Sequence, residues 1–394
     1  MRISLLSSAL VASLVGYGST IALVLAAART LGATEAETAS WVLAICLAKA
    51  AGSAWLSFSS RVPVVLAWST PGAALIAASQ GATMAQGVGA FVITGLMVMA
   101  TGAIGPLGRL VARIPEGIAS GMLAGVLLPF CLKGAVAAQA LGGPALAILI
   151  VFLLIRLGNP ALAVLGALAI GVALAYGLGQ AHLPELSLPL PHLTLIPPVF
   201  RVDVILGLAL PLYLVTMASQ NLPGFATLRA AGYVPPVRPA LLTTGALSAI
   251  AGLFGAHTVS MAAITAAICL GDDVHPDRAQ RWKVGLAYAA AWIGLGLLGP
   301  ISLPLLHSLP PEVMALIVGL ALIGPLTSAL SSAYQAPETR FAATITAVTT
   351  ASGVTATVVI PGAGTAATAS FGAAFLGLIA GLAIHALGRM AKRP

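Results

Sequence analysis

Charged side chains are scarce in this chain: Asp, Glu, Lys and Arg make up 7% of its 394 residues, where an ordinary soluble domain carries roughly 25%. Hydrophobic residues make up 59%, and the mean hydropathy is +1.05. Such a chain has too few polar side chains to cover a surface that faces water. The composition therefore excludes a soluble globular protein and predicts a protein that is embedded in a lipid bilayer.

Cysteine is also scarce, and enzyme motifs are missing. The 3 cysteines, Cys46, Cys131 and Cys269, stand singly in apolar runs, without the paired spacing of a metal or redox site. The sequence contains no GxxxxGKS/T loop, no HExxH and no GxSxG, the motifs that hold nucleotide phosphates, zinc or a serine nucleophile. We therefore expect no metal, no cofactor other than a coupling proton, no ATP-driven step and no enzyme activity.

Long apolar runs fill the chain instead. A membrane span needs about 20 apolar residues, so this length accommodates about fourteen spans and no soluble domain. The first run is longer than the core of a cleavable signal peptide, and we expect it to remain as the first span. The predicted fold is an all-α polytopic membrane protein. Its predicted spans cover residues 5–28, 37–57, 61–79, 88–104, 117–137, 144–157, 160–178, 204–222, 239–255, 252–270, 283–298, 313–330, 341–358 and 365–386.

The 18 basic residues test this count. With a cytoplasmic N-terminus, fourteen of them fall on the inner side, while Arg29, Lys133 and Arg201 fall outside and Lys49 lies within the second span. A missed span would invert every later loop, so the positive-inside rule supports the count and predicts that both termini are cytoplasmic. The net charge of +8 then reflects membrane orientation, and we expect no nucleic-acid partner.

An internal repeat divides the chain into two halves. Pro115-Glu116 is followed by Pro129, and Pro311-Glu312 is followed by Pro325 at the same interval. Each half holds seven predicted spans, an odd number, so the second copy must be inserted upside down. The pattern thus predicts two inverted repeats of seven spans.

Two mirrored segments, 61–79 and 252–270, are broken by Gly, Pro and hydroxyl residues. Each is predicted to be a short extended segment followed by a half-helix, and such pairs mark the binding site in many transporters. The first half-helix is predicted to begin at Thr70 to Gly72, and the second near Val259 or Ser260. Because a helix N-terminus presents free N–H groups and a positive dipole end, both starts favour an anion.

Three runs carry a resemblance to a known family: STPGAALIAAS (69–79), SQNLPGFATLRAAGY (219–233) and FGAHTVSMAAITAAICLGDDVHPDRAQRW (254–282). These runs, and essentially the whole chain, resemble the BenE benzoate transporter family, which is similar in architecture to nucleobase/ascorbate transporters and sulfate permeases. The resemblance implies proton-coupled benzoate import across a bacterial inner membrane. It also implies a core domain, residues 1–105 and 201–300, that moves against a gate domain, residues 106–200 and 301–394.

The candidate site rests both on the residue pattern of the two broken segments and on the family resemblance. Similar nucleobase transporters place one carboxylate in span 8 and another in span 10, whereas both regions lack acids here, which favours an anionic ligand. His257, the only imidazole predicted deep in the membrane, is the candidate proton carrier. Lys49 could pair with an anion, although a long side chain can also snorkel to the interface. The predicted substrate-binding residues are Tyr17, Ser69, Thr70, Pro71, Gly72, Ser219, Gln220, Asn221, His257, Thr258, Val259 and Ser260.

Other functions remain open on the sequence alone. A nucleobase or other anion carrier of the same fold is one alternative, and a passive anion channel is another. A channel needs a continuous polar lining, whereas the polar residues here gather at the two breaks, which favours a carrier. The residues do not decide whether the chain works as a homodimer.

Overall fold

The computed structural model describes residues 3–105, 115–160, 162–182, 191–262, 264–360 and 367–391. Within these residues the chain is mostly helical. Seven helices are long and apolar enough to cross a membrane, or up to eight if a pair bent by 58° between Arg278–Leu297 and Gly299–His307 counts as one span. The predicted class, a helical polytopic membrane protein, is confirmed at this level.

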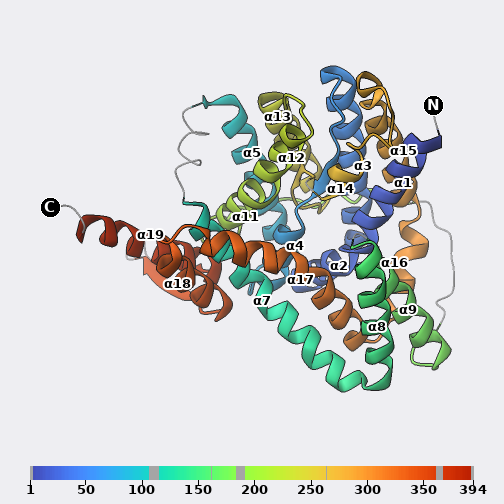
Figure 1. Cartoon of the computed structure of the whole chain (residues 1–394). Coiled ribbons are helices and arrows are strands. Elements are labelled where there is room, and N and C mark those ends of the chain that lie inside the picture. The colour runs from blue at the N-terminus through green and yellow to red at the C-terminus, as the bar shows by residue number, and fades with distance from the viewer. Residues whose placement is uncertain are drawn as a thin grey trace.

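The helices gather into two groups (Figure 1). The first group lies mainly in the upper half of the view, with α2 and α16 lower down, and comes from two separate parts of the chain. From residues 3–105 it contains α1 (Ile3–Gly18), α2 (Ile21–Thr30), α3 (Glu35–Ser60), α4 (Thr70–Ala78) and α5 (Met84–Ala103). From residues 202–307 it contains α10 (Val202–Val204), η1 (Ile205–Ala209), α11 (Leu210–Thr216), η2 (Met217–Asn221), α12 (Leu222–Ala230), α13 (Val237–Gly252), α14 (Ile264–Ile268), η3 (Arg278–Gln280), α15 (Lys283–Leu297) and α16 (Gly299–His307).

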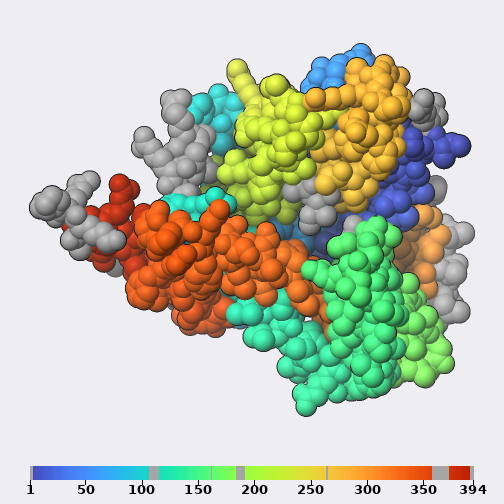
Figure 2. Space-filling view, in the orientation of Figure 1, coloured from blue at the N-terminus to red at the C-terminus, as the bar shows by residue number. Residues whose placement is uncertain are grey.

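The second group runs from the left, at α19 and α18, to the lower right, at α8 and α9, in the same view, and it is again built from two parts of the chain. It contains α7 (Glu116–Leu141), α8 (Gly143–Gly158), α9 (Ala163–Gly177), α17 (Pro311–Gln335), α18 (Arg340–Ala351) and α19 (Ala373–Ala391). Figure 2 shows α8 and α9, in green, as a projection at the lower edge of the molecule. Each group therefore unites residues from both halves of the sequence.

Helix pairing repeats between the two halves. In the first group α3 packs on α15 and α5 packs on α13, and in the second group α7 packs along α17. The helices α7 and α17 are the two that begin at Pro-Glu and carry a proline in their interior, Pro129 and Pro325. The residues that mark the internal repeat thus lie on helices that pack against each other.

The first predicted span is confirmed as one apolar helical stretch, Ile3–Thr30, with a break inside it, whereas the thirteenth and fourteenth, 341–358 and 365–386, each contain a strand where a helix was predicted. The first, 5–28, is broken between α1 and α2, where the Ser19 hydroxyl donates to the Val15 carbonyl and the Thr20 hydroxyl to the Gly16 carbonyl. The thirteenth, 341–358, ends as a helix at Ala351 and continues into β3 (Ala356–Ile360), which pairs with β4 (Ala367–Phe371). Hydroxyl side chains that bond to their own backbone explain the first break. The β-branched run of β3 is typical of a strand.

Other ends differ by a few residues. Span 8 is longer than predicted, a continuous helical stretch from Val202 to Ala230 with two π-helical segments, η1 and η2. The boundaries predicted between the core and gate domains include 105/106 and 300/301. Pro106 is outside the described residues, and Pro300 lies in the first turn of α16, the helix that connects the first group to α17.

A stripe of small residues lets α7 approach α18 closely. An added Cβ at Gly117 would lie 2.5 Å from Thr339 Oγ1, one at Gly121 would meet the Ala343 backbone, and one at Gly125 would lie 2.6 Å from Thr350 Cβ. Small residues that let helix backbones approach in this way are typical of helix packing in membranes.

Gly121→Ala is expected to destabilise the protein by about 1–3 kcal/mol, because the new methyl group would overlap the α18 backbone and force the helices apart. The control is Gly294→Ala on α15, where an added Cβ meets nothing within 4 Å and alanine is the better helix former. Thermal unfolding in detergent measures both. Equal melting temperatures for the two variants would show that α7 and α18 do not pack as described.

A candidate anion site at two broken membrane segments

The two predicted extended segments pair with each other. Strands β1 (Leu66–Trp68) and β2 (Val259–Met261) run antiparallel, with Ala67 opposite Ser260. The ladder continues on both sides, since Ser69 N–H donates to the Thr258 carbonyl at 3.0 Å and Ala262 N–H to the Val65 carbonyl at 3.2 Å. Non-helical backbone is tolerated at membrane depth where it is buried in protein and satisfied in this way. The ladder therefore holds the two breaks at one place in the first helix group.

The first half-helix begins where the sequence predicts. Ser69 caps α4, because its side-chain oxygen accepts from Gly72 N–H at 3.1 Å, and Pro71 stands in the first turn. Ala73 N–H donates to the Ser69 carbonyl. In the described part of the chain, Thr70 N–H is the amide of this turn that keeps no acceptor, so the α4 start offers one backbone donor together with its dipole end.

The second half-helix begins later than predicted. Val259 and Ser260 lie in β2, and α14 starts at Ile264. The β-branched Val259 and its neighbours form backbone hydrogen bonds with β1, so this segment is a strand and not the start of a helix. The Ser260 hydroxyl is buried and donates to the Ala67 carbonyl at 3.3 Å. These two residues are therefore ladder residues, and the prediction of a helix start there is wrong.

A hydroxyl cluster joins both breaks to span 8. Thr216 at the end of α11 donates its hydroxyl hydrogen to Ser69 Oγ at 3.0 Å, and its oxygen lies 3.0 Å from Thr258 Oγ1. All three side chains are fully buried. Sequence reasoning missed Thr216, although a hydroxyl in an apolar span, one turn before the polar run 219–221, is the signal that could have found it.

The polar residues 219–221 of span 8 have different roles in the structure. Asn221 is fully buried and structural, because its Oδ1 accepts from Met261 N–H of β2 at 2.9 Å and its Nδ2 donates to Met217 Sδ. The Ser219 hydroxyl donates to the Val215 carbonyl, and Gln220 is half-buried. All three lie at η2, and π-helical turns of this kind are frequent at functional sites.

His257 lies behind the ladder, against α3. Its Nδ1 accepts from the indole N–H of Trp41 at 3.0 Å, and Trp41 in turn packs on Phe91 of α5. Since an indole N–H can only donate, Nδ1 carries a lone pair and the ring proton sits on Nε2. The Nε2 atom is buried and makes no hydrogen bond of normal geometry within the described residues, although it lies near the Ser69 backbone.

Lys49 lies inside an aromatic cage. Its ammonium is 4.0 Å from the centroid of Trp68 and 2.9 Å from that of Trp292 on α15. Tyr17 of α1 packs on both indoles, with centroid distances of 6.1 and 6.2 Å, and its hydroxyl pairs with Ser302 of α16 at 2.8 Å. The Trp68 indole donates to Thr20 Oγ1 at the break of the first span. Lys49 is 1% exposed, so it does not snorkel to the interface.

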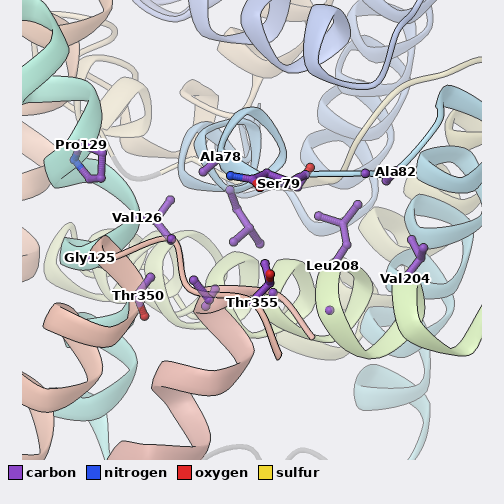
Figure 3. A pocket seen from close by; sticks show the side chains of 18 of the residues that line it. Ala78, Ser79, Ala82, Gly125, Val126, Pro129, Val204, Leu208, Thr350 and Thr355 are labelled. Atoms are coloured by element: carbon purple, nitrogen blue, oxygen red, sulfur yellow. The ribbon is translucent and has the colours of Figure 1, made fainter. Parts of the chain in front are cut away.

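A cleft separates the two helix groups at the far end of α4. It has a volume of about 470 Å³ and is lined by residues of α4, α5, α7, η1 and α18, with Lys133 and Arg201 among its polar groups. Figure 3 shows Ala78 and Ser79 on one wall, Leu208 beside them, and Val126 and Thr350 on the facing wall. Leu75 lies in the lining, five residues from Thr70, so the cleft reaches to within about 7.5 Å of the α4 start along the helix.

The paired breaks, the two helix groups and the cleft between them define a membrane transport protein. Residues 1–387 match the model of the benzoate membrane transport protein family, BenE, and the chain belongs to that family.

Two relatives and two solved structures resemble this chain. The chain is 36% identical over 371 residues to the inner membrane protein YdcO of Escherichia coli (94% of this chain, 92% of that one). It is 32% identical over 344 residues to a benzoate membrane transport protein of Acinetobacter baylyi (87% of each). The fold resembles the transmembrane domain of a cyanobacterium bicarbonate transporter, BicA, with a TM-score of 0.57 at 15% identity, covering 90% of this chain and 99% of that one. It also resembles the murine anion transporter Slc26a9, with a TM-score of 0.61 at 12% identity, covering 100% of this chain and 69% of that one.

Proposed function

We propose that this chain is a secondary active transporter that imports benzoate, or a close aromatic monocarboxylate, together with a proton. The observation that carries the proposal is the composition of the site. The α4 start, a cluster of hydroxyls and a lysine meet there, and no acid lies in the adjoining stretches 204–230 and 252–270. Such a site favours a carboxylate and disfavours a ligand that must be held by Asp or Glu.

The membrane arrangement that goes with this function has fourteen spans in two inverted repeats. The repeated pairings, α3 with α15, α5 with α13 and α7 with α17, support it. The first helix group then forms the core domain and the second the gate domain, and alternating access moves one against the other. With both termini in the cytoplasm of a bacterial cell, the predicted topology places Lys133 and Arg201, and with them this cleft, on the outer side. Substrate reaches the site past Lys133, which attracts anions, whereas the charge of Arg201 in the same lining is paired with Asp203.

Proton coupling follows from the charge of the substrate. Importing a monoanion against an inside-negative potential costs roughly 2.3 kcal/mol per 100 mV, and a proton carried with it makes the cycle electroneutral. His257 remains a predicted carrier. However, protonating its Nδ1 would break the hydrogen bond from Trp41, and the site holds a second buried base, Lys49.

Counterflow in proteoliposomes tests the proposed function. Vesicles loaded with unlabelled benzoate are expected to accumulate external labelled benzoate transiently, because a carrier exchanges substrates and a channel does not. Uracil, sulfate and bicarbonate serve as competitors that separate the alternatives. Labelled benzoate that only equilibrates, whatever the internal load, would contradict the carrier mechanism. Competition by uracil or sulfate in place of benzoate would contradict the substrate class.

A further inference from the structure

The aromatic cage around Lys49 contains hydrogen-bond donors that have no acceptor. Among the described residues, four buried side-chain polar atoms lack a hydrogen-bond partner, and two of them, Trp292 Nε1 and Thr265 Oγ1, lie in this region. The Tyr288 hydroxyl donates to the Leu66 carbonyl at 2.9 Å, and its oxygen is the nearby acceptor for both, without normal hydrogen-bond geometry to either. Buried donors normally find acceptors, so the indole N–H and the Thr265 hydroxyl can donate to a further acceptor.

The ammonium of Lys49 lacks a partner of the same kind. No carboxylate of the described residues lies within 4.0 Å of it, and it makes close contacts with the faces of Trp68 and Trp292. An aromatic face compensates only part of the cost of burying a charge. A buried cation is normally paired with an anion. When Lys49 is protonated, its ammonium therefore requires a negatively charged acceptor close by.

The cage adjoins the two breaks. Trp68 is the last residue of β1 and directly precedes the Ser69 cap of α4. Thr265 stands in the first turn of α14, and an added Cβ at Gly16 of α1 would lie 3.3 Å from Trp292 and 3.6 Å from Thr265. The ammonium, the indole N–H, the Thr265 hydroxyl and the aromatic faces therefore come together beside the α4 start, where the proposed function places the carboxylate.

We propose that Lys49 is the counter-charge of the substrate carboxylate, with Trp292 Nε1 and Thr265 Oγ1 as its hydrogen-bond donors, and that Lys49 takes up the transported proton when the anion binds. This inference rests on the proposed function and assigns its anion site and its coupling group. The substrate that fits is an aromatic monocarboxylate, because the single charge is matched by one ammonium and the ring by the faces of Tyr17 and Trp68.

The coupling step balances in charge. The empty carrier holds a neutral amine at Lys49, because an unpaired ammonium is disfavoured in a buried site. The arriving carboxylate stabilises the ammonium, so a proton from water joins the Nζ lone pair as the anion binds, and the loaded carrier has gained no net charge. On the inner side the anion leaves and the proton follows it to water. By linkage, the anion and the proton each raise the affinity of the other.

The other titratable groups around Lys49 are poor carriers. Cys46 lies one turn away on α3, Tyr17 faces the cage from α1, Tyr288 from α15 and Cys269 from the end of α14. Their side chains are neutral in their ordinary state at neutral pH and lose a proton only in alkaline solution. His257 lies within electrostatic reach of Lys49, but its acceptor nitrogen is occupied by Trp41. Lys49 is thus the base in this site that can both pair with the bound anion and take up the proton.

Lys49→Met tests the counter-charge. Methionine keeps the apolar stem of lysine and most of its length, and replacing the neutral amine of the empty carrier by an apolar group leaves no polar side-chain atom of residue 49 unpaired in the cage. We expect benzoate affinity, measured by calorimetry on the purified full-length protein, to fall by about 100-fold or more, with an unchanged or higher melting temperature. Lys283→Met, which removes the same charge from the start of α15, serves as the matched control and is expected to bind like the wild type.

Lys49→Arg tests the proton. Because arginine stays protonated and stacks on aromatic faces, this variant is expected to bind benzoate within about tenfold of the wild type. In weakly buffered solution at neutral pH, the wild type is expected to take up about one proton per benzoate bound, and Lys49→Arg almost none. Proton uptake is read with an indicator dye.

The outcomes separate the two proposals. A wild type that does not bind benzoate would overturn the proposed function itself. Wild-type affinity in Lys49→Met, loss of binding in Lys49→Arg, or undiminished proton uptake in Lys49→Arg would overturn the role of Lys49 alone. Uptake that survives in Lys49→Arg and disappears in His257→Gln would assign the proton to His257.

Discussion

Thr70→Asp is expected to abolish benzoate binding while leaving α4 folded. Thr70 is the first residue of α4, half-buried, and its N–H is the amide of this turn without an acceptor. A carboxylate in the first turn of a helix interacts favourably with the dipole, so the fold does not suffer. The same carboxylate competes for the donor and repels the substrate. Two unit charges 4 Å apart interact by about 4 kcal/mol at an effective dielectric constant of 20, which corresponds to about a thousandfold loss of affinity.

The control for this prediction is Thr70→Asn, which has the shape of Asp without its charge. It is expected to keep benzoate affinity within about tenfold of the wild type, and both variants should melt no earlier than the wild type. Isothermal titration with benzoate measures binding, and thermal unfolding measures the fold. Equal affinities in the Asp and Asn variants would exclude an anion at the α4 start.

The structure explains why Thr70 is a better position for this test than Gly72 or Ser260, which also lie at the helix starts predicted from the sequence. An added Cβ at Gly72 would lie 2.6 Å from Leu212 Cδ1 and 2.8 Å from Ser69 Oγ, so any side chain there would disturb packing and the cap. Ser260 is fully buried in β2. A substitution at either position changes the fold as well as the charge, whereas Thr70 separates the two effects.

Local chemistry predicted the first break well. A Ser-Thr-Pro-Gly run carries both the cap and the first turn of a helix, and Ser69 and Pro71 take those roles. The second break is harder to predict, because the sequence around Val259 and Ser260 is compatible with either a strand or the start of a helix. Their partner in β1 is almost two hundred residues away, and only tertiary pairing decides the outcome.

The cage was only partly predictable. Lys49 and Tyr17 can be identified from the sequence as polar or aromatic residues within predicted spans. The other residues lie far from them in the chain and are brought close by the packing of α15, α14 and α11, namely Trp292, Thr265 and Thr216. The spacing of apolar residues and the composition predict which side of a helix is apolar, but they do not predict which helices pack against each other. The residues that depend on such meetings are therefore the ones that the sequence missed.

A disulfide between the two helix groups is expected to stop transport and to leave binding intact. Gly18 on α1 faces Leu165 on α9, since an added Cβ at Gly18 would lie 3.4 Å from Leu165 Cγ and closer still to its Cδ2. Replacing both by cysteine removes the bulky leucine end and brings the two sulfurs within bonding reach. In a background with Cys46, Cys131 and Cys269 replaced by alanine, oxidation should reduce benzoate uptake to the level of empty vesicles, because a linked core cannot move against the gate.

Reduction with dithiothreitol should restore that uptake, and calorimetry on the oxidised protein should still detect benzoate. The matched control links two helices of the core, with cysteines at Gly102 on α5 and Leu241 on α13, which face each other in the structure. Because both helices move together in a rigid core, this second disulfide should leave transport unchanged. Full transport with Gly18→Cys and Leu165→Cys crosslinked would mean that α1 and α9 travel as one body. The boundary between moving parts would then lie elsewhere, and the cleft beside α4 and α7 would no longer mark it.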